Sequence, residues 1–267
     1  MTSLVALTRL PAQRLVDRCE LTFLERRPID LARLHAEHRA YREALAAAGA
    51  RVIALDPIEH LPDSTFVEDA AVVLDEIAVL ARPGAASRRD EPAHVEAPLR
   101  MHRRHVEAIA APGLLEGGDV LRIGETLYIG LSTRTDRAGL EAFAALAIGF
   151  GYRVVPVTVH GSLHLKTACT ALDDETLLLN PAWLDTSAFS SFARIEVDTE
   201  EPFAANVLPV GNALIANAAF PRTLARIHAH AAHTDRRVLP VDLTEFGKAE
   251  AGLTCLSLMF SGAGDAP

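Results

Sequence analysis

The stretch Gly252-Leu253-Thr254-Cys255-Leu256-Ser257-Leu258-Met259-Phe260 places one cysteine on the rim of an apolar, strand-like run near the end of the chain. Free cysteines are among the most buried residue types, so Cys255 taken alone is best interpreted as a packing residue. Four earlier segments follow the same plan, and two of them carry a histidine or a glutamate where a reactive cysteine would need a partner. The stretch therefore predicts a chain built from repeated units that bring distant residues together.

Composition limits the kind of protein this is. The 267 residues suffice for one large domain or two small ones, and 49% hydrophobic residues can fill a sizeable core. A net charge of -9 argues against nucleic acid or a membrane surface as the main partner. The cysteines Cys19, Cys169 and Cys255 are widely spaced and odd in number, which indicates free thiols. No apolar run reaches ~18 residues and the start lacks a signal peptide, so we expect a soluble cytoplasmic protein.

The repeated unit is a hairpin, a helix and a closing strand, and it occurs about five times. The clearest copy has a hairpin over residues 120–129, a helix that begins after Asp136 and ends near Gly149, and a strand over residues 153–157. Hairpins are also expected over residues 70–80, 167–179 and 206–217. Equivalent helices are expected over residues 31–48, 98–109, 183–192 and 221–231, and closing strands over residues 51–55, 194–197 and 237–241.

Polar residues stand at the start of successive hairpins. The positions Asp69, Asp119, His164, Asn206 and Cys255 are separated by 50, 45, 42 and 49 residues. The last unit runs out of chain, and residues 31–55 can supply its helix and strand, which favours a closed ring over a solenoid with two capped ends. In a ring the hairpin starts converge on the axis. One small space is then shared by Glu68, Asp69, Glu116, Asp119, His164 and Cys255.

This convergence permits nucleophilic chemistry. A cysteine attacks as a thiolate, and a nearby imidazolium lowers its pKa. His164 can supply that charge and then deliver a proton to a leaving group. Glu116 can accept a hydrogen bond from the other ring nitrogen and so orient the imidazole. The three residues form a Cys-His-Glu set that is dispersed in sequence.

The carboxylates of Glu68, Asp69 and Asp119 would repel one another unless a cation binds among them. A guanidinium suits this role because its planar fork pairs bidentately with carboxylates, and its electrophilic carbon would lie beside sulfur. Carboxylates with histidine and cysteine can also form a metal site, although no HxxxH or CxxC spacing supports one. Each acidic segment, considered separately, is also compatible with a solvated turn.

Four ordered motifs together resemble the dimethylarginine dimethylaminohydrolase family, within the guanidino-modifying enzymes that include arginine deiminase. They are Phe66-Val67-Glu68-Asp69, Leu115-Glu116-Gly117-Gly118-Asp119, Leu163-His164-Leu165-Lys166 and Leu253-Thr254-Cys255. The resemblance covers roughly residues 4–260 and implies a five-bladed α/β propeller, or pentein, with residues 1–267 as a single catalytic domain. Arginine deiminases usually carry Thr-Arg-Asp where this chain has Val67-Glu68-Asp69.

The resemblance also implies residue roles. Cys255 matches the nucleophile, His164 the general acid/base, and Glu116 the carboxylate that positions the histidine. The remaining matches are expected to contact substrate. Glu68 and Asp69, with Phe66 in the same motif, are expected at the guanidinium. Asp63 and the lid residue Leu21 are expected at the α-amino group, Arg88 and Arg134 at the α-carboxylate, and Ala249 is expected to contact the substrate through its backbone.

The implied activity is hydrolysis of Nω-methylated arginine to citrulline and dimethylamine through a covalent thiouronium on Cys255, without a cofactor or metal. Two alternatives stay open: deiminase-type hydrolysis of free arginine to citrulline and ammonia, and non-catalytic binding of arginine-like cations. The expected partner is a small arginine derivative, not nucleic acid or membrane. The sequence leaves the oligomeric state open, with a homodimer as one option. Lack of periodicity predicts a lid near residues 16–27.

Overall fold

The structure is a computed structural model that describes residues 3–262, and its strands form five separate three-stranded sheets. In each sheet the middle strand pairs with one neighbour in antiparallel fashion and with the other in parallel fashion. In four of the sheets the antiparallel pair is a hairpin. The sheets are β3 (Ala71–Val73), β4 (Ile77–Leu80) and β5 (His105–Ala108); β6 (Val120–Ile123), β7 (Thr126–Leu131) and β8 (Arg153–Thr158); β9 (Cys169–Ala171), β10 (Thr176–Leu179) and β11 (Ala193–Glu196); β12 (Leu208–Val210), β13 (Ala213–Asn217) and β14 (Arg237–Val241); β15 (Leu258–Ser261), β1 (Leu4–Arg9) and β2 (Arg51–Leu55).

The ring is closed by the two ends of the chain. Strand β1 pairs with β15 in antiparallel fashion, with Leu7 opposite Leu258, and with β2 in parallel fashion. Residues at the first strand of all five sheets line one central cavity of about 730 Å³. The closed ring predicted from the repeat is therefore confirmed, including the completion of the last unit by the first, and so is the five-bladed α/β propeller that the resemblance implies.

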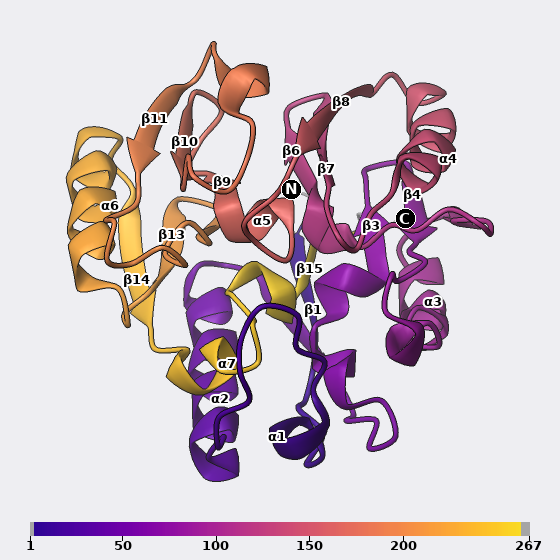
Figure 1. Cartoon of the computed structure of the whole chain (residues 1–267), viewed down its shortest axis with the longest axis horizontal. Helices are drawn as coiled ribbons and strands as arrows, with labels where there is room; N and C mark the ends of the chain where they lie inside the picture. The colour runs from indigo at the N-terminus through magenta and orange to yellow at the C-terminus, as the bar shows by residue number, and fades with distance from the viewer. Residues whose placement is uncertain (1–2, 263–267) are drawn as a thin grey trace.

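The long helices lie at the periphery of the ring, and the short helix α5 (Leu165–Ala168) lies near its middle (Figure 1). The long ones are α2 (Leu31–Ala47), α3 (Ala93–Arg100), α4 (Arg137–Ile148) and α6 (Pro221–His233). The short ones are α1 (Leu15–Arg18), α5 (Leu165–Ala168) and α7 (Thr244–Gly247), with 3₁₀ turns at Pro62–Thr65, Val67–Ala70, Ala86–Arg88, Gly117–Asp119, Thr186–Phe189 and Thr254–Leu256. Among the described residues, no helix is both long and apolar enough to span a membrane.

Capping residues in the sequence define the ends of α2 and α4, the two helices that were predicted best. Asp30 accepts the N–H groups of the first turn of α2, at 2.9 and 3.1 Å, and the helix ends before Gly49, whose φ of 98° is left-handed. Asp136 caps α4 in the same way, accepting the N–H of Gly139 at 2.7 Å. The side chains of Leu34, His38, Tyr41 and Leu45 form a buried stripe along α2.

The prediction for residues 98–109 is wrong. The helix there is α3, which contains Pro98 near its middle, and residues 105–108 form strand β5 beside β4. Strand β5 lies at the outer edge of its sheet and is mostly exposed, so it lacks the apolar pattern that marks a strand. The helix expected over residues 183–192 is also reduced to a single 3₁₀ turn, Thr186–Phe189.

The apolar core consists of five clusters that lie between neighbouring sheets and the segments covering them. In one cluster Phe143 of α4 packs with Ile77 of β4 and Leu127 of β7. Another joins α2 to Ile215 of β13 and includes Cys255. Because the core runs around the ring, the polar turns that precede the first strands meet near the axis.

Candidate active site

The turns that precede the first strands meet at a small pocket. Asp69 comes from the turn Val67–Ala70, His164 directly precedes α5, and Cys255 lies in the turn Thr254–Leu256. The pocket has a volume of about 20 Å³. Among the predicted residues, those that line it are Asp63, Phe66, Asp69, Arg88, Arg134, His164, Ala249 and Cys255. Glu116 lies behind His164, whereas Glu68 and Leu21 do not line the pocket.

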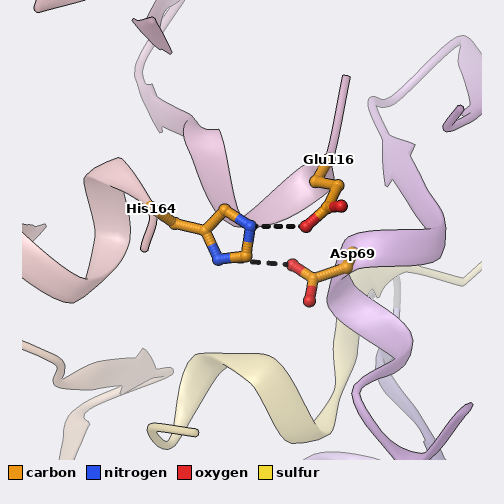
Figure 2. A group of neighbouring side chains, drawn as sticks. All are labelled: Asp69, Glu116 and His164. Atoms are coloured by element: carbon orange, nitrogen blue, oxygen red, sulfur yellow. Dashed lines mark hydrogen bonds and ion pairs between the residues drawn. The ribbon is translucent and has the colours of Figure 1, made fainter. Parts of the chain in front are cut away.

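His164 is held by carboxylates on both sides (Figure 2). Its Nε2 lies 2.7 Å from Oε2 of Glu116, and its Nδ1 lies 3.8 Å from Oδ1 of Asp69. Burial acts to lower the pKa of the imidazole, but Asp69, Glu116 and Asp119 outweigh it and raise the pKa of His164 to about 9. The histidine is therefore an imidazolium at neutral pH, and the ion pair holds the pKa of Glu116 well below its usual value.

Two buried arginines balance this negative charge. Arg88 donates to Oδ2 of Asp69 at 2.8 Å, and Arg134 lies 3.4 Å from Oε1 of Glu116. Arg88 is also paired with Glu91, at 2.8 Å from Nη2 to Oε2. All three of its guanidinium nitrogens are thus bound by protein groups. Arg134 instead donates its Nη2 to the hydroxyl of Thr22 at 2.9 Å, a partner that a ligand can replace.

The group Asp69, Glu116 and His164 has the composition of a metal site, with ligand atoms within 4.8 Å of one another. However, Arg88 and Arg134 place guanidinium groups against two of these three side chains. Their positive charge compensates the carboxylates and would repel a metal cation. The arrangement favours an ion-pair network over a metal centre.

Cys255 lies in a negative environment. Burial raises the pKa of its thiol above the ordinary value, and the carboxylates of Asp69 and Glu68 raise it further. The N–H of Gly252 points at Sγ from 3.4 Å and acts in the opposite direction. The thiol is therefore neutral at neutral pH, and a cation bound beside Asp69 would promote its ionisation.

Glu68 is turned away from the pocket. Its Oε2 accepts the hydroxyl of Thr254 at 2.7 Å, and its Oε1 is paired with the ammonium of Lys166. Glu68 and Lys166 line the central cavity instead. Sequence reasoning expected Glu68 beside Asp69 at the guanidinium. Consecutive residues in a 3₁₀ turn point in different directions, so only Asp69 faces His164 and Cys255.

Asn206 and Lys166 are two residues to which the sequence assigned no role. The Asn206 side chain accepts the N–H of Thr254 at 3.0 Å and donates to its hydroxyl at 3.0 Å. It also donates to the carbonyl of Lys166 at 2.8 Å. Asn206 thus anchors the turn that carries Cys255. Its place at the head of the fourth hairpin is the sequence signal for this position.

Two glycines are required where the turns meet. A Cβ atom on Gly117 would lie 2.0 Å from the carbonyl oxygen of Glu68. A Cβ atom on Gly118 would lie 2.6 Å from Nδ1 of His164 and 2.7 Å from Oδ1 of Asp69. The pair Gly117-Gly118 therefore allows the close approach of the second and first hairpin starts.

The loop that follows α1 runs beside α7 (Figure 1). Its Glu20 lines the pocket, and the N–H of Glu20 donates to Oδ2 of Asp63 at 3.0 Å. Leu21, the predicted lid residue, is half-buried against the cluster that contains Cys255. Burial raises the pKa of Asp63.

Comparisons with known proteins agree with this geometry. A family model for arginine deiminase matches residues 56–218. The N(G),N(G)-dimethylarginine dimethylaminohydrolases of Streptomyces coelicolor and Pseudomonas aeruginosa are 41% and 36% identical to the chain. The matches cover 97% and 95% of the chain, and 97% and 98% of those proteins.

Solved structures agree as well. A mutant of the Pseudomonas aeruginosa enzyme complexed with citrulline matches with a TM-score of 0.89 and 35% identity, over 97% of this chain and 100% of that one. The N-terminal domain of ArgZ, a cyanobacterial arginine dihydrolase, shares the fold with a TM-score of 0.85 at 22% identity, over 96% and 98% of the two chains. From its fold, its pocket and these relatives, the chain belongs to the dimethylarginine dimethylaminohydrolase family.

Proposed function

We propose that the protein hydrolyses Nω-methylated arginine, with dimethylarginine as the preferred substrate, to citrulline and dimethylamine through a covalent thiouronium on Cys255. The observation that carries this proposal is the meeting of the Cys255 thiol, the His164 imidazolium and the Asp69 carboxylate at one buried pocket. The names of the relatives, and the citrulline in the related structure, support the same reaction.

The first step uses the charge of the substrate. A guanidinium held by Asp69 brings a positive charge beside Sγ and lowers the pKa of Cys255, so that the thiol loses its proton to solvent. The thiolate attacks the guanidinium carbon. Since Nε2 of His164 is bound to Glu116, Nδ1 is the ring atom that protonates the departing amine. Dimethylamine leaves, and the thiouronium remains on Cys255.

The second step restores the enzyme. The now neutral His164 accepts a proton from water, and the resulting hydroxide attacks the thiouronium carbon. The carbon–sulfur bond breaks and citrulline is released as its carbonyl forms. The hydroxyl proton of the adduct passes to the departing thiolate, which restores the neutral Cys255 thiol. Sulfur, imidazole and water suffice for both steps, so we propose that residues 1–267 act as one catalytic domain without a cofactor. Its three free cysteines fit a reducing cytoplasm.

The amino-acid end of the substrate needs its own contacts. We propose that Arg134 binds the α-carboxylate in exchange for Thr22, and that Asp63 and the backbone of Leu21 bind the α-amino group. Ala249 and Phe66 complete the wall of the pocket. Arg88 contributes mainly through its charge, because Glu91 and Asp69 hold its guanidinium. Glu68 accepts the hydroxyl of Thr254 and does not contact the substrate, but its carboxylate adds negative charge near the bound cation.

A citrulline assay with purified wild type and Cys255→Ser tests the proposal. We expect wild type to release citrulline and dimethylamine in equal amounts and Cys255→Ser to release neither. Mass spectrometry should detect the adduct only in protein that retains Cys255. Near wild-type turnover by Cys255→Ser would contradict the mechanism.

Two alternatives are separated by the same assay. Comparison of kcat/KM for dimethylarginine, monomethylarginine and arginine decides between the methylated and the free substrate. A larger kcat/KM for arginine, with release of ammonia, would favour a deiminase. Binding of these cations without citrulline release would favour the non-catalytic alternative.

A further inference from the structure

We propose that Glu250 is a positioning residue that holds the lid loop, defined here as residues 20–27, closed over the pocket. The consequence for substrate affinity rests on the proposed function. The physical contact does not, since it is made between two parts of the chain itself.

The contact consists of one carboxylate and three successive backbone amides. Both oxygens of Glu250 accept the N–H of Thr22, each at 3.0 Å. One of them also accepts the N–H groups of Phe23 at 2.6 Å and Leu24 at 2.5 Å. Successive N–H groups that converge in this way form a concavity that favours an anion. Hydrogen bonds to a carboxylate are also stronger than those to a neutral acceptor.

The backbone of Glu250 adopts an unusual conformation to make this contact. Its φ is 59°, in the left-handed region that non-glycine residues seldom occupy. Glycine would adopt this backbone without strain, so the backbone alone does not call for a glutamate. The residue also stands between Ala249 and Ala251, and all three line the pocket. The left-handed residue therefore directs its carboxylate towards the lid loop from the edge of the pocket.

The lid loop makes other contacts as well: Glu20 accepts the hydroxyl of Ser87 at 2.7 Å, Arg26 donates to the carbonyl of Cys19 at 2.6 Å, and Leu21 packs against the cluster that contains Cys255. Its tip residue Phe23 is 46% exposed and provides little burial. The loop also touches Asp63 through Glu20 and Arg134 through Thr22. Both of these body residues are proposed to bind the substrate, which would compete for them. Glu250 is an anchor of the loop backbone that stays available when the contacts with Asp63 and Arg134 are exchanged.

Closure of this loop controls the access of a ligand to the pocket. A pocket of about 20 Å³ has room for roughly one water molecule, so a ligand of arginine size requires the loop to move. The free energy of closing then contributes to apparent affinity, because only the closed state encloses the ligand. Glu250 should accordingly affect substrate binding more than the chemical step.

The variant Glu250→Gln tests this role, with Glu59→Gln as a matched control. The carboxylate of Glu59 also accepts a backbone N–H, that of Gln13 at 3.2 and 3.1 Å, at an exposed site outside the pocket. Hydrogen–deuterium exchange of the peptide containing Thr22–Leu24 measures the contact directly. In Glu250→Gln we expect about tenfold faster exchange there, and a KM raised about tenfold with kcat changed less than about twofold. Glu250→Ala should give the same pattern.

The outcomes separate the two proposals. Unchanged exchange at Thr22–Leu24 in both Glu250 variants would overturn the role of Glu250. A fall in kcat at constant KM would also overturn it, because Glu250 would then act on the reacting groups. Faster exchange in a protein that releases citrulline from no tested substrate would support the contact and reject the proposed function. Equal acceleration in Glu59→Gln would show a general loosening and overturn the specific role.

Discussion

The Nε2 atom of His164 lies 2.7 Å from Oε2 of Glu116, and both side chains are buried, with exposed fractions of 2% and 0%. These residues are 48 positions apart and come from two different units of the ring. Their contact keeps one ring nitrogen occupied and stabilises the imidazolium. It leaves Nδ1 as the atom for proton transfer, which makes the pair a determinant of the pH range of activity.

Removal of this carboxylate should shift the pH profile. The imidazolium is the proton donor, so kcat of wild type should fall as pH rises through about 9, the pKa of His164. Glu116→Gln removes one group that raises this pKa, so its kcat should fall at a lower pH, by about one unit. The measurement is kcat for dimethylarginine across the basic range, with Glu96→Gln as a surface control. An unshifted basic limb in Glu116→Gln would contradict the assignment of His164.

The Cys255 thiol should be neutral in the resting protein. Burial, Asp69 and Glu68 raise its pKa, so thiolate absorbance should first appear above about 8.5, the ordinary pKa of cysteine. The ultraviolet difference between wild type and Cys255→Ser, recorded during a pH titration, isolates this one thiol. Thiolate absorbance at neutral pH would refute activation by the cationic substrate.

The two glycines before Asp119 should respond differently to substitution. Gly118→Ala places a Cβ against the side chains of His164 and Asp69, so we expect about a hundredfold loss of kcat with the fold retained. Gly117→Ala places a Cβ against the backbone of Glu68 and should lower the free energy of unfolding by about 1–3 kcal/mol or more.

The control for these variants is Gly247→Ala. A Cβ atom there would meet nothing within 4 Å among the described residues apart from its chain neighbours and the backbone of α7, and we expect a stability change within about 0.5 kcal/mol. Thermal unfolding and the citrulline assay measure the two effects separately. If Gly117→Ala and Gly118→Ala lowered kcat and the free energy of unfolding to the same extent, the close approach of Gly118 to His164 and Asp69 would have no specific effect on kcat.

The pair Lys166–Glu68 should be structural as well as electrostatic. Lys166→Met leaves the buried carboxylate of Glu68 without its cation, and we expect the free energy of unfolding to fall by about 3–5 kcal/mol. Lys166→Met combined with Glu68→Gln should recover most of this stability. The exposed pair Arg100–Glu96 provides the control, since Arg100→Ala should cost at most about 1 kcal/mol. Denaturant unfolding of these three variants and of the single variant Glu68→Gln checks the expectation, and additive losses in the double variant would contradict it.

Local chemistry explains which elements were predictable. Helix α2 has a cap at Asp30, an apolar stripe and a stop at Gly49, so its bounds follow from neighbouring residues. Strand β5 has no such signals, because it is an exposed edge strand and forms only against β4. Pro98, which marks a helix start in sequence, instead lies inside α3. Prediction failed where a partner distant in sequence determines the local structure.

By itself the sequence determined the repeated unit, its closure into a ring and the convergence of Asp69, His164 and Cys255, because spacing and apolar periodicity are local properties that repeat. Only the tertiary structure decided how each polar side chain is used. Glu68 turns to Lys166 and Thr254, Arg88 is held by Glu91, and Glu250 binds the lid loop. The physical reason is that a buried polar group must find its hydrogen-bond partners in three dimensions. In this ring most of those partners lie on other units, tens to hundreds of residues away.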